Sequence, residues 1–268
     1  MRPGLFRLNF SLCVVLTILA VSCYTRKEGC LDTLAANFDV TADDPCGQCC
    51  IFPSLSLEVT HNAGDTLLNT EAIYTNQLNQ KYQILDIRYY LSGFVLSPAG
   101  QPNVRIREVI QNNTGSVIEY NDMHICRIAD KVINVGTVRS FGRFDTLSFD
   151  LGLSDKVLSN EFTSLPSDHV LLKNNRLNDE AGNIVFATLK YVHVKPDKRD
   201  TINLSFGASS DRFDIRVDST LVTQKGSHII YRLKTDYLKI LIDADLDKSP
   251  ENIKTTAGKN LRSAIGVR

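Results

Sequence analysis

The stretch Leu55-Ser-Leu-Glu-Val-Thr-His61 alternates apolar and polar side chains. Successive side chains of a β-strand point to opposite faces of the sheet, so this period of two predicts a strand with one buried face. The same alternation returns in residues 146–151, 201–206 and 213–217, with turn residues between these segments. Many short strands spaced in this way predict an antiparallel β-sandwich over residues 53–268.

Other segments of this region agree with an all-β fold. The runs 82–96, 183–195 and 227–243 are rich in Val, Ile, Tyr and Phe, which favour strands. Only residues 252–264, near the carboxyl terminus, have a pattern that suits a short helix.

The composition narrows the range of functions. The chain has 268 residues and is 43% hydrophobic, which suits a folded globular domain. Its 30 basic side chains balance 30 acidic ones, and they form no basic cluster. A neutral chain of this kind has nothing to neutralise phosphates, so we expect no nucleic-acid partner.

The amino terminus has the pattern of an export signal. Two arginines precede an apolar run over residues 10–21, which is too short for a comfortable membrane span, and Ser22-Cys23 follows. The segment Leu19-Ala-Val-Ser-Cys23 resembles the lipobox of bacterial lipoproteins. That resemblance implies that residues 1–22 are removed and that Cys23 is acylated, which would anchor the protein to a membrane. An ordinary secretory signal with an incidental cysteine is the alternative.

Four further cysteines lie close together in residues 23–52, which we expect to form a small stalk module. They are Cys30, Cys46, Cys49 and Cys50. In an oxidising compartment such a cluster predicts disulfides, although the sequence leaves their connectivity open. A zinc site is the alternative, because the Cys46-x-x-Cys49 spacing suits zinc ligands. The segment 29–50 also resembles a disulfide-closed module of exported Bacteroidetes proteins, with Asp32, Asn37 and Asp39 among the matching positions.

Longer motifs resemble the MbnP-like domain. These are the Leu55–His61 stretch, Ile84-Leu-Asp-Ile-Arg-Tyr-Tyr-Leu-Ser-Gly-Phe-Val-Leu96 and Leu147-Ser-Phe-Asp-Leu-Gly-Leu-Ser-Asp155. The resemblance covers most of residues 53–265 and implies an exported β-sandwich, with copper as the ligand of the member that names the family. Copper binding in that branch uses histidines and an oxidised Trp. This chain has no Trp, and His61 is the position that matches.

Three residues are candidate metal ligands: His61, His124 and Cys126. Imidazole and thiol ligands suit copper, and His124 and Cys126 would share one face of a strand, with Met123 on the other. The alternatives are a hydrogen-bonded buried histidine at His61 and a buried core thiol at Cys126.

Local signatures of common enzymes are absent from the sequence, which contains no G-x-S-x-G, H-E-x-x-H, phosphate-loop or dinucleotide motif. We therefore expect a non-catalytic lipoprotein, anchored to the outer membrane, whose β-sandwich binds a ligand, with copper as a candidate. The alternative is a structural accessory subunit of an outer-membrane protein complex. The sequence leaves open which face of that membrane the protein occupies.

Overall fold

The computed structural model describes residues 25–98, 100, 102–106, 108–111, 117–120, 123–158, 165, 169–207 and 213–267. The predicted signal and Cys23 lie outside these residues. The chain divides into two compact units, Met1–Ile51 and Phe52–Arg268. Within the described part of the chain, no helix is both long and apolar enough to cross a membrane.

The first unit is small and depends on cross-links. Its strands β1 (Glu28–Gly29) and β2 (Asp44–Pro45) form one short parallel pair. Two disulfides, Cys30–Cys50 and Cys46–Cys49, join the four cysteines that the sequence marks as disulfide candidates. These bonds use all four sulfurs, so no thiolate remains there to bind zinc.

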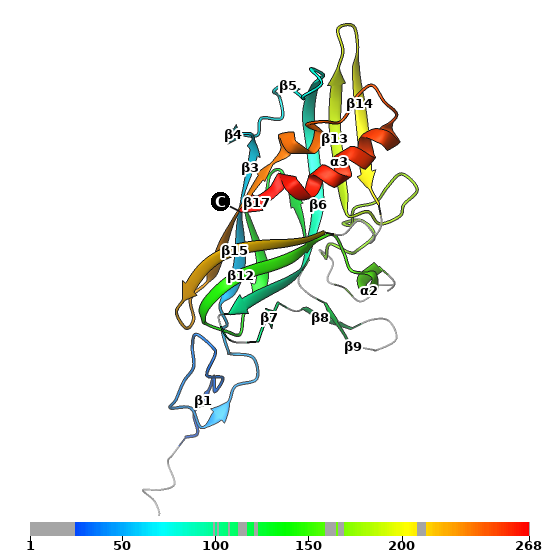
Figure 1. Ribbon diagram of the computed structural model, residues 1–268. Coiled ribbons are helices and arrows are strands. Elements are labelled where there is room, and N and C mark those ends of the chain that lie inside the picture. The colour runs from blue at the N-terminus through cyan, green and yellow to red at the C-terminus, as the bar shows by residue number, and fades with distance from the viewer. Residues whose placement is uncertain are drawn as a thin grey trace, which may run out of the picture. The chain divides into compact units, whose positions relative to one another are not determined.

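The second unit consists mainly of strands, which confirms the predicted all-β sandwich (Figure 1). The strands that form its two main sheets are β3 (Ser54–Ala63), β4 (Thr66–Leu67), β5 (Tyr74–Thr75), β6 (Lys81–Pro98), β7 (Val104–Arg105), β10 (His124–Arg127), β11 (Val132–Thr137), β12 (Gly142–Leu151), β13 (Ala187–Val194), β14 (Arg199–Phe206), β15 (Phe213–Thr223), β16 (Ile229–Asp236) and β17 (Ile265–Val267). A separate hairpin pairs β8 (Glu108–Gln111) with β9 (Val117–Tyr120), and α2 (Asp155–Leu158) is a single helical turn.

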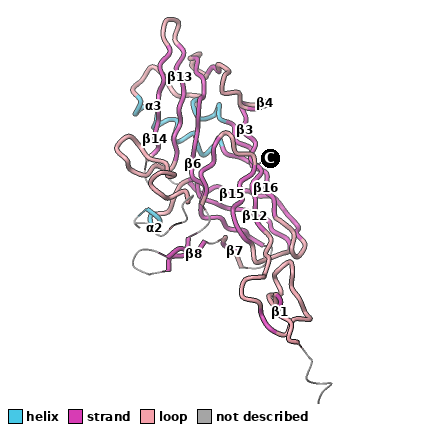
Figure 2. Tube along the Cα trace, turned by 180° about the vertical axis from the view of Figure 1, so that it is seen from behind, coloured by secondary structure: helices cyan, strands magenta, loops and turns pink. Residues whose placement is uncertain are grey.

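The larger sheet is built around β6. Its first half pairs with β13 and its second half with β12, and the order of the sheet is β14-β13-β6-β12-β15. The smaller sheet has the order β11-β3-β16-β17. All pairs in these two sheets are antiparallel except β3 with β16, which run parallel. Figure 2 shows β6, β13 and β14 side by side from behind.

The core lies where the predicted apolar faces meet. The alternating residues Leu55, Leu57 and Val59 of β3 are buried, as are Leu147 and Phe149 of β12. They belong to one large cluster of buried apolar side chains contributed by both sheets. The alternation in the sequence therefore identifies the buried face of these strands correctly.

A glycine allows β6 to continue past an irregularity in its neighbour. Gly93 has a φ of +66°, and a Cβ atom at this position would lie 2.5 Å from Oδ2 of Asp150. Asp150 belongs to β12, whose register against β6 shifts between Ser148 and Asp150. The side chain of Asp150 occupies the space that a Cβ atom would need, and the positive φ also favours glycine at position 93.

The strand-like run at residues 227–243 is only partly a strand. β16 ends at Asp236, and the 3-10 helix η2 (Tyr237–Leu241) follows directly. The carboxylate of Asp236 accepts a hydrogen bond from the amide of Leu238, which caps the new helix. The strand tendency of this run therefore holds only as far as Asp236, because an apolar run has no periodicity that separates a strand from a buried helical turn.

The predicted carboxyl-terminal helix is confirmed as α3 (Pro250–Ala264). It begins with proline, whose fixed φ and missing amide hydrogen suit the first helical turn. Ile253, Ala257 and Leu261 follow a helical spacing and are buried in the main core. In Figure 1, α3 (red) lies across strands β6, β13 and β14.

Candidate functional site

His61 lies in a buried network between two partners that are distant in the sequence. Its Nδ1 atom is 2.6 Å from the hydroxyl of Tyr237, and its Nε2 atom is 2.6 Å from the carbonyl oxygen of Asp130. The side chain continues the buried face of β3, as the sequence predicts. The structural alternative for this residue, a hydrogen-bonded buried histidine, therefore describes its geometry.

The two partners define the tautomer of the ring. A carbonyl oxygen carries no proton, so Nε2 of His61 must donate to Asp130. In the neutral ring, Nδ1 then accepts from the hydroxyl of Tyr237. Burial lowers the pKa of His61 from its usual 6.5, so the fold favours this neutral form. Neither ring nitrogen offers a lone pair to a metal ion in this arrangement.

Cys126 is a buried free thiol in the same core. It lies opposite Tyr89 in the β6–β10 pair and is hydrogen-bonded to that tyrosine. The hydroxyl of Tyr89 in turn lies 3.4 Å from the hydroxyl of Thr235. Burial raises the pKa of Cys126 to about 12, which opposes the thiolate form that binds metals best.

The remaining candidate residues follow the predicted alternation. Met123 packs in a second apolar cluster, whereas Cys126 lies in the main core, so the two point to opposite sides of the sheet. His124 is half-buried and lies opposite Leu91. Within the described ranges, no three side chains of His, Cys, Asp or Glu come together as a metal site. His61, His124 and Cys126 are not gathered into such a group in this part of the chain.

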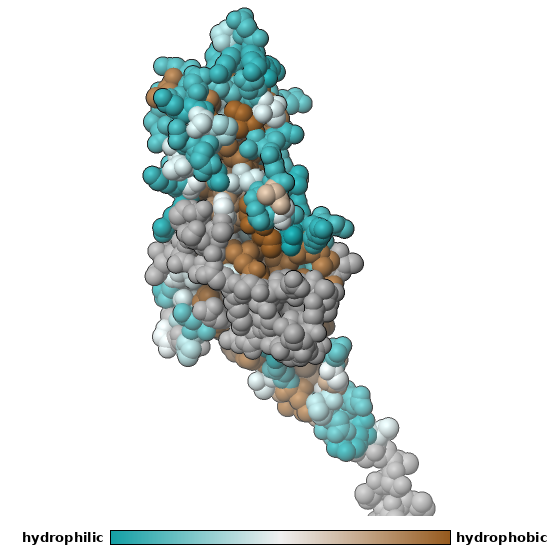
Figure 3. Space-filling model, turned by 90° about the vertical axis from the view of Figure 1, so that its right-hand side faces the viewer, coloured by the Kyte–Doolittle hydropathy of each residue, from teal (hydrophilic) through white to brown (hydrophobic). Residues whose placement is uncertain are grey.

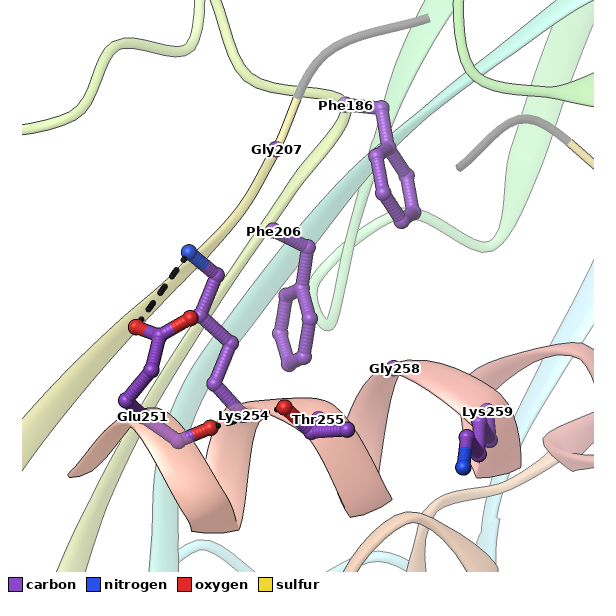
Figure 4. Close-up of a pocket in the computed structure, with 8 residues that line it drawn as sticks. All are labelled: Phe186, Phe206, Gly207, Glu251, Lys254, Thr255, Gly258 and Lys259. Carbon is purple, nitrogen blue, oxygen red and sulfur yellow. Dashed lines mark hydrogen bonds and ion pairs between the residues drawn. The ribbon is translucent and has the colours of Figure 1, made fainter. Parts of the chain in front are cut away.

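A pocket of about 340 Å³ lies elsewhere, where α3 faces the ends of strands (Figure 4). Phe206 ends β14, and Phe186 immediately precedes β13. Their rings are 6.1 Å apart and tilted by 47° to one another. Figure 4 shows the ring of Phe206 facing the helix and the ring of Phe186 farther from the helix, and the two rings form an apolar wall of the pocket.

The opposite wall comes from one face of α3 and is polar. It contains Glu251, Lys254, Thr255 and Lys259. Nζ of Lys254 is 3.7 Å from the carboxylate of Glu251, a long ion pair. The hydroxyl of Thr255 donates to the carbonyl oxygen of Glu251 and is thereby held against the helix. Two ammonium groups against one carboxylate give the lining a net positive charge.

Gly258 sets the distance between the two walls. A Cβ atom there would be 3.4 Å from Cδ1 of Phe206, which is a tight contact. Glycine within a helix costs about 1 kcal/mol relative to alanine, and here its absent side chain leaves room for the ring. Gly207, which follows Phe206, completes the lining without adding a side chain.

Sequence reasoning misses this pocket. Lys254, Thr255 and Gly258 share a helix face in the predicted helix, which is the only available signal. Nothing in the pattern places Phe186 or Phe206 against that helix. Figure 3 shows the molecule from the right-hand side of Figure 1. Apolar residues reach the surface on this face, and hydrophilic residues lie above them.

No protein-family model and no curated protein is significantly similar to this chain. Among solved structures, MbnP from Methylosinus trichosporium is similar, with 14% sequence identity and a TM-score of 0.44. The alignment covers 72% of this chain and 78% of that protein. The likeness is distant.

Proposed function

We propose that the protein is a lipid-anchored binding protein of the cell envelope that holds a small amphiphilic anion without reacting with it. The observation that carries this proposal is the pocket between α3 and the strand ends. Its volume of about 340 Å³ is within the range typical of small-molecule sites.

The lining favours a ligand with two chemically different parts. The rings of Phe186 and Phe206 suit an aromatic or acyl group, which gains free energy when it leaves water. Lys254 and Lys259 suit a carboxylate or a similar anionic group. Glu251 offsets one of these two positive charges, and the positive charge that remains favours an anion over an uncharged or cationic ligand.

The lining does not resemble a catalytic centre. It contains neither histidine nor cysteine, and its one hydroxyl, on Thr255, donates to a helix carbonyl. We therefore propose binding and not catalysis. Copper is not our proposed ligand at His61, because both of its ring nitrogens already contact protein atoms.

The location is inferred from the sequence. The export signal and the acylation site at Cys23 favour attachment to the outer membrane of a Gram-negative cell. The disulfides of the first unit fit an oxidising compartment. An accessory subunit docked on an outer-membrane complex stays the alternative.

Calorimetric titration with 2-naphthoate, an aromatic carboxylate, tests the pocket. We expect saturable binding with one site per chain, and at least fivefold weaker binding of the uncharged 2-naphthalenemethanol. Lys254→Gln should weaken 2-naphthoate binding about fivefold, which corresponds to about 1 kcal/mol for an exposed charge contact. Gly258→Val should abolish it by filling the pocket.

Lys248→Gln is the matched control, because Lys248 is exposed and does not line the pocket. It should leave binding unchanged. Absence of saturable binding, or equal loss in the Lys248 and Lys254 variants, would contradict the proposal. Co-purification of the unliganded protein with an outer-membrane complex would then favour the alternative.

A further inference from the structure

The two disulfides of the first unit close loops of very different size. Cys30 and Cys50 are 20 positions apart in the sequence, whereas Cys46 and Cys49 are 3 apart. A cross-link restricts the unfolded chain more when it closes a longer loop. The Cys46–Cys49 bond therefore contributes less to folding than the Cys30–Cys50 bond.

The two bonds also differ in their access to solvent. Cys30 is only 1% exposed, so its bond has one end in the interior of the unit. Cys49 is exposed and Cys46 is half-buried. Between them, Gly47 is exposed, and a Cβ atom placed there would meet no other atom within 4 Å. Cys49 and Gly47 thus lie on an exposed part of the loop, where a thiol on another molecule can reach the Cys46–Cys49 bond.

Hydrogen bonds hold this segment in place without help from the Cys46–Cys49 bond. The side chain of Asn37 donates to the carbonyl oxygen of Cys49 at 2.7 Å and accepts from the amide of Ile51 at 2.8 Å. The amide of Cys46 donates to the carbonyl oxygen of Gly29 at 2.9 Å. Both ends of the four-residue loop are thus fixed, so its two sulfurs stay close together after reduction.

A short, exposed C-x-x-C disulfide on a separately supported backbone is the arrangement used for reversible exchange. We propose that Cys46–Cys49 is a thiol–disulfide exchange site whose partner is a protein dithiol, and that Cys30–Cys50 is the structural bond. This inference does not depend on the pocket. It assigns the first unit a chemical role in addition to that of a stalk.

A thiolate of the partner attacks Sγ of the exposed Cys49, the bond to Cys46 breaks, and Cys46 leaves as a thiolate that takes up a proton. The partner's second thiol then attacks the partner's first sulfur, which is held in the mixed disulfide. This step closes a disulfide within the partner and releases Cys49 as a thiol. The partner is oxidised to a disulfide, and this unit is reduced by two electrons.

Graded reduction of the oxidised full chain tests the assignment. The protein is equilibrated with increasing dithiothreitol, quenched with acid, alkylated, and analysed by peptide mass spectrometry. We expect Cys46 and Cys49 to become alkylated at a dithiothreitol concentration at least tenfold lower than Cys30 and Cys50. Alkylation in denaturant after the quench labels every reduced thiol, including buried Cys30, whereas in a parallel sample alkylated without denaturant Cys126 should stay unmodified, which shows that the second unit has not unfolded.

Thioredoxin, a protein dithiol, tests exchange with a macromolecule. Reduced thioredoxin should open Cys46–Cys49 and become oxidised in equal amount, with Cys30–Cys50 intact. The Cys46→Ser variant, incubated with oxidised glutathione, should carry glutathione on Cys49. Joint reduction of both disulfides, failure of thioredoxin where dithiothreitol succeeds, or absence of the adduct would each overturn the proposal.

Discussion

The hydroxyl of Tyr237 and Nδ1 of His61 lie 2.6 Å apart in the core, although the two residues are 176 positions apart in the sequence. Tyr237 is the first residue of η2, and His61 lies near the end of β3. The contact therefore fixes the 3-10 turn that follows β16 against a strand of the same sheet. Its role in this structure is to stabilise the fold.

Tyr237→Phe should lower the free energy of unfolding by about 1–2 kcal/mol, because Nδ1 of buried His61 loses its donor. Tyr191→Phe is the matched control. The hydroxyl of Tyr191 is buried and finds no hydrogen-bond partner among the described residues, so its removal should cost nothing or slightly stabilise the protein. Urea denaturation measures both changes, and equal effects would contradict this role.

The pH dependence of stability should include a contribution from His61. Burial lowers the pKa of this residue in the folded protein below its usual 6.5. As pH falls below about 6.5, the unfolded chain takes up more protons than the folded chain, so stability falls. The stabilisation that buried, neutral His61 contributes is fully present above that pH. It is lost as the pH falls to the pKa of His61 in the folded protein.

His61→Gln should therefore give a shallower loss of stability between pH 7.5 and pH 5, measured as urea midpoints. His193 needs its own control, because burial and then Lys195 lower its pKa in the same direction. A variant with His193→Gln removes that second contribution. An unchanged slope in the His61→Gln protein would refute the assignment.

Gly93→Ala should destabilise the second unit by about 2–4 kcal/mol. The new side chain would adopt an unfavourable φ and would also clash with the carboxylate of Asp150. Gly182→Ala separates the two effects, since Gly182 also has a positive φ but nothing lies within 4 Å of its Cβ position. That control should cost only about 1–2 kcal/mol in thermal or urea unfolding.

The proposed acylation of Cys23 predicts how the protein should partition. Expressed with its signal in a Gram-negative host, the protein should enter the detergent phase of a phase-separation assay, and its first peptide should begin at an acylated Cys23. Cys23→Ala should move it to the aqueous phase, whereas Cys126→Ala should not. An unmodified amino terminus, or a cytosolic pool with all thiols reduced, would disprove the anchor.

The sequence predicts local features of this fold well. The alternation around Leu57 and Phe149 identifies their strands and their buried faces, because side-chain direction in a strand depends only on position. The same logic places Met123 and Cys126 on opposite sides. The strand tendency of the run 227–243 holds only as far as Asp236, where a capped 3-10 turn follows within an apolar run.

Long-range relationships are not available from the pattern. Alternation predicts that His61 points inward, but it does not name Tyr237 or Asp130 as its partners. The pocket is missed for the same reason, since Phe186, Phe206 and α3 meet only through the order of strands in the sheet. The preference for disulfides at Cys30, Cys46, Cys49 and Cys50 could be predicted, whereas their pairing could not.

The pocket beneath α3 is the most direct place to test the proposed function. Amide chemical shifts of the isotopically labelled chain, recorded during titration with 2-naphthoate, should change at Gly207, Lys254 and Gly258 and saturate together at one ligand per chain. The amides around His61 should not move. Shifts that gather around His61 and Cys126, or that do not saturate, would contradict the account.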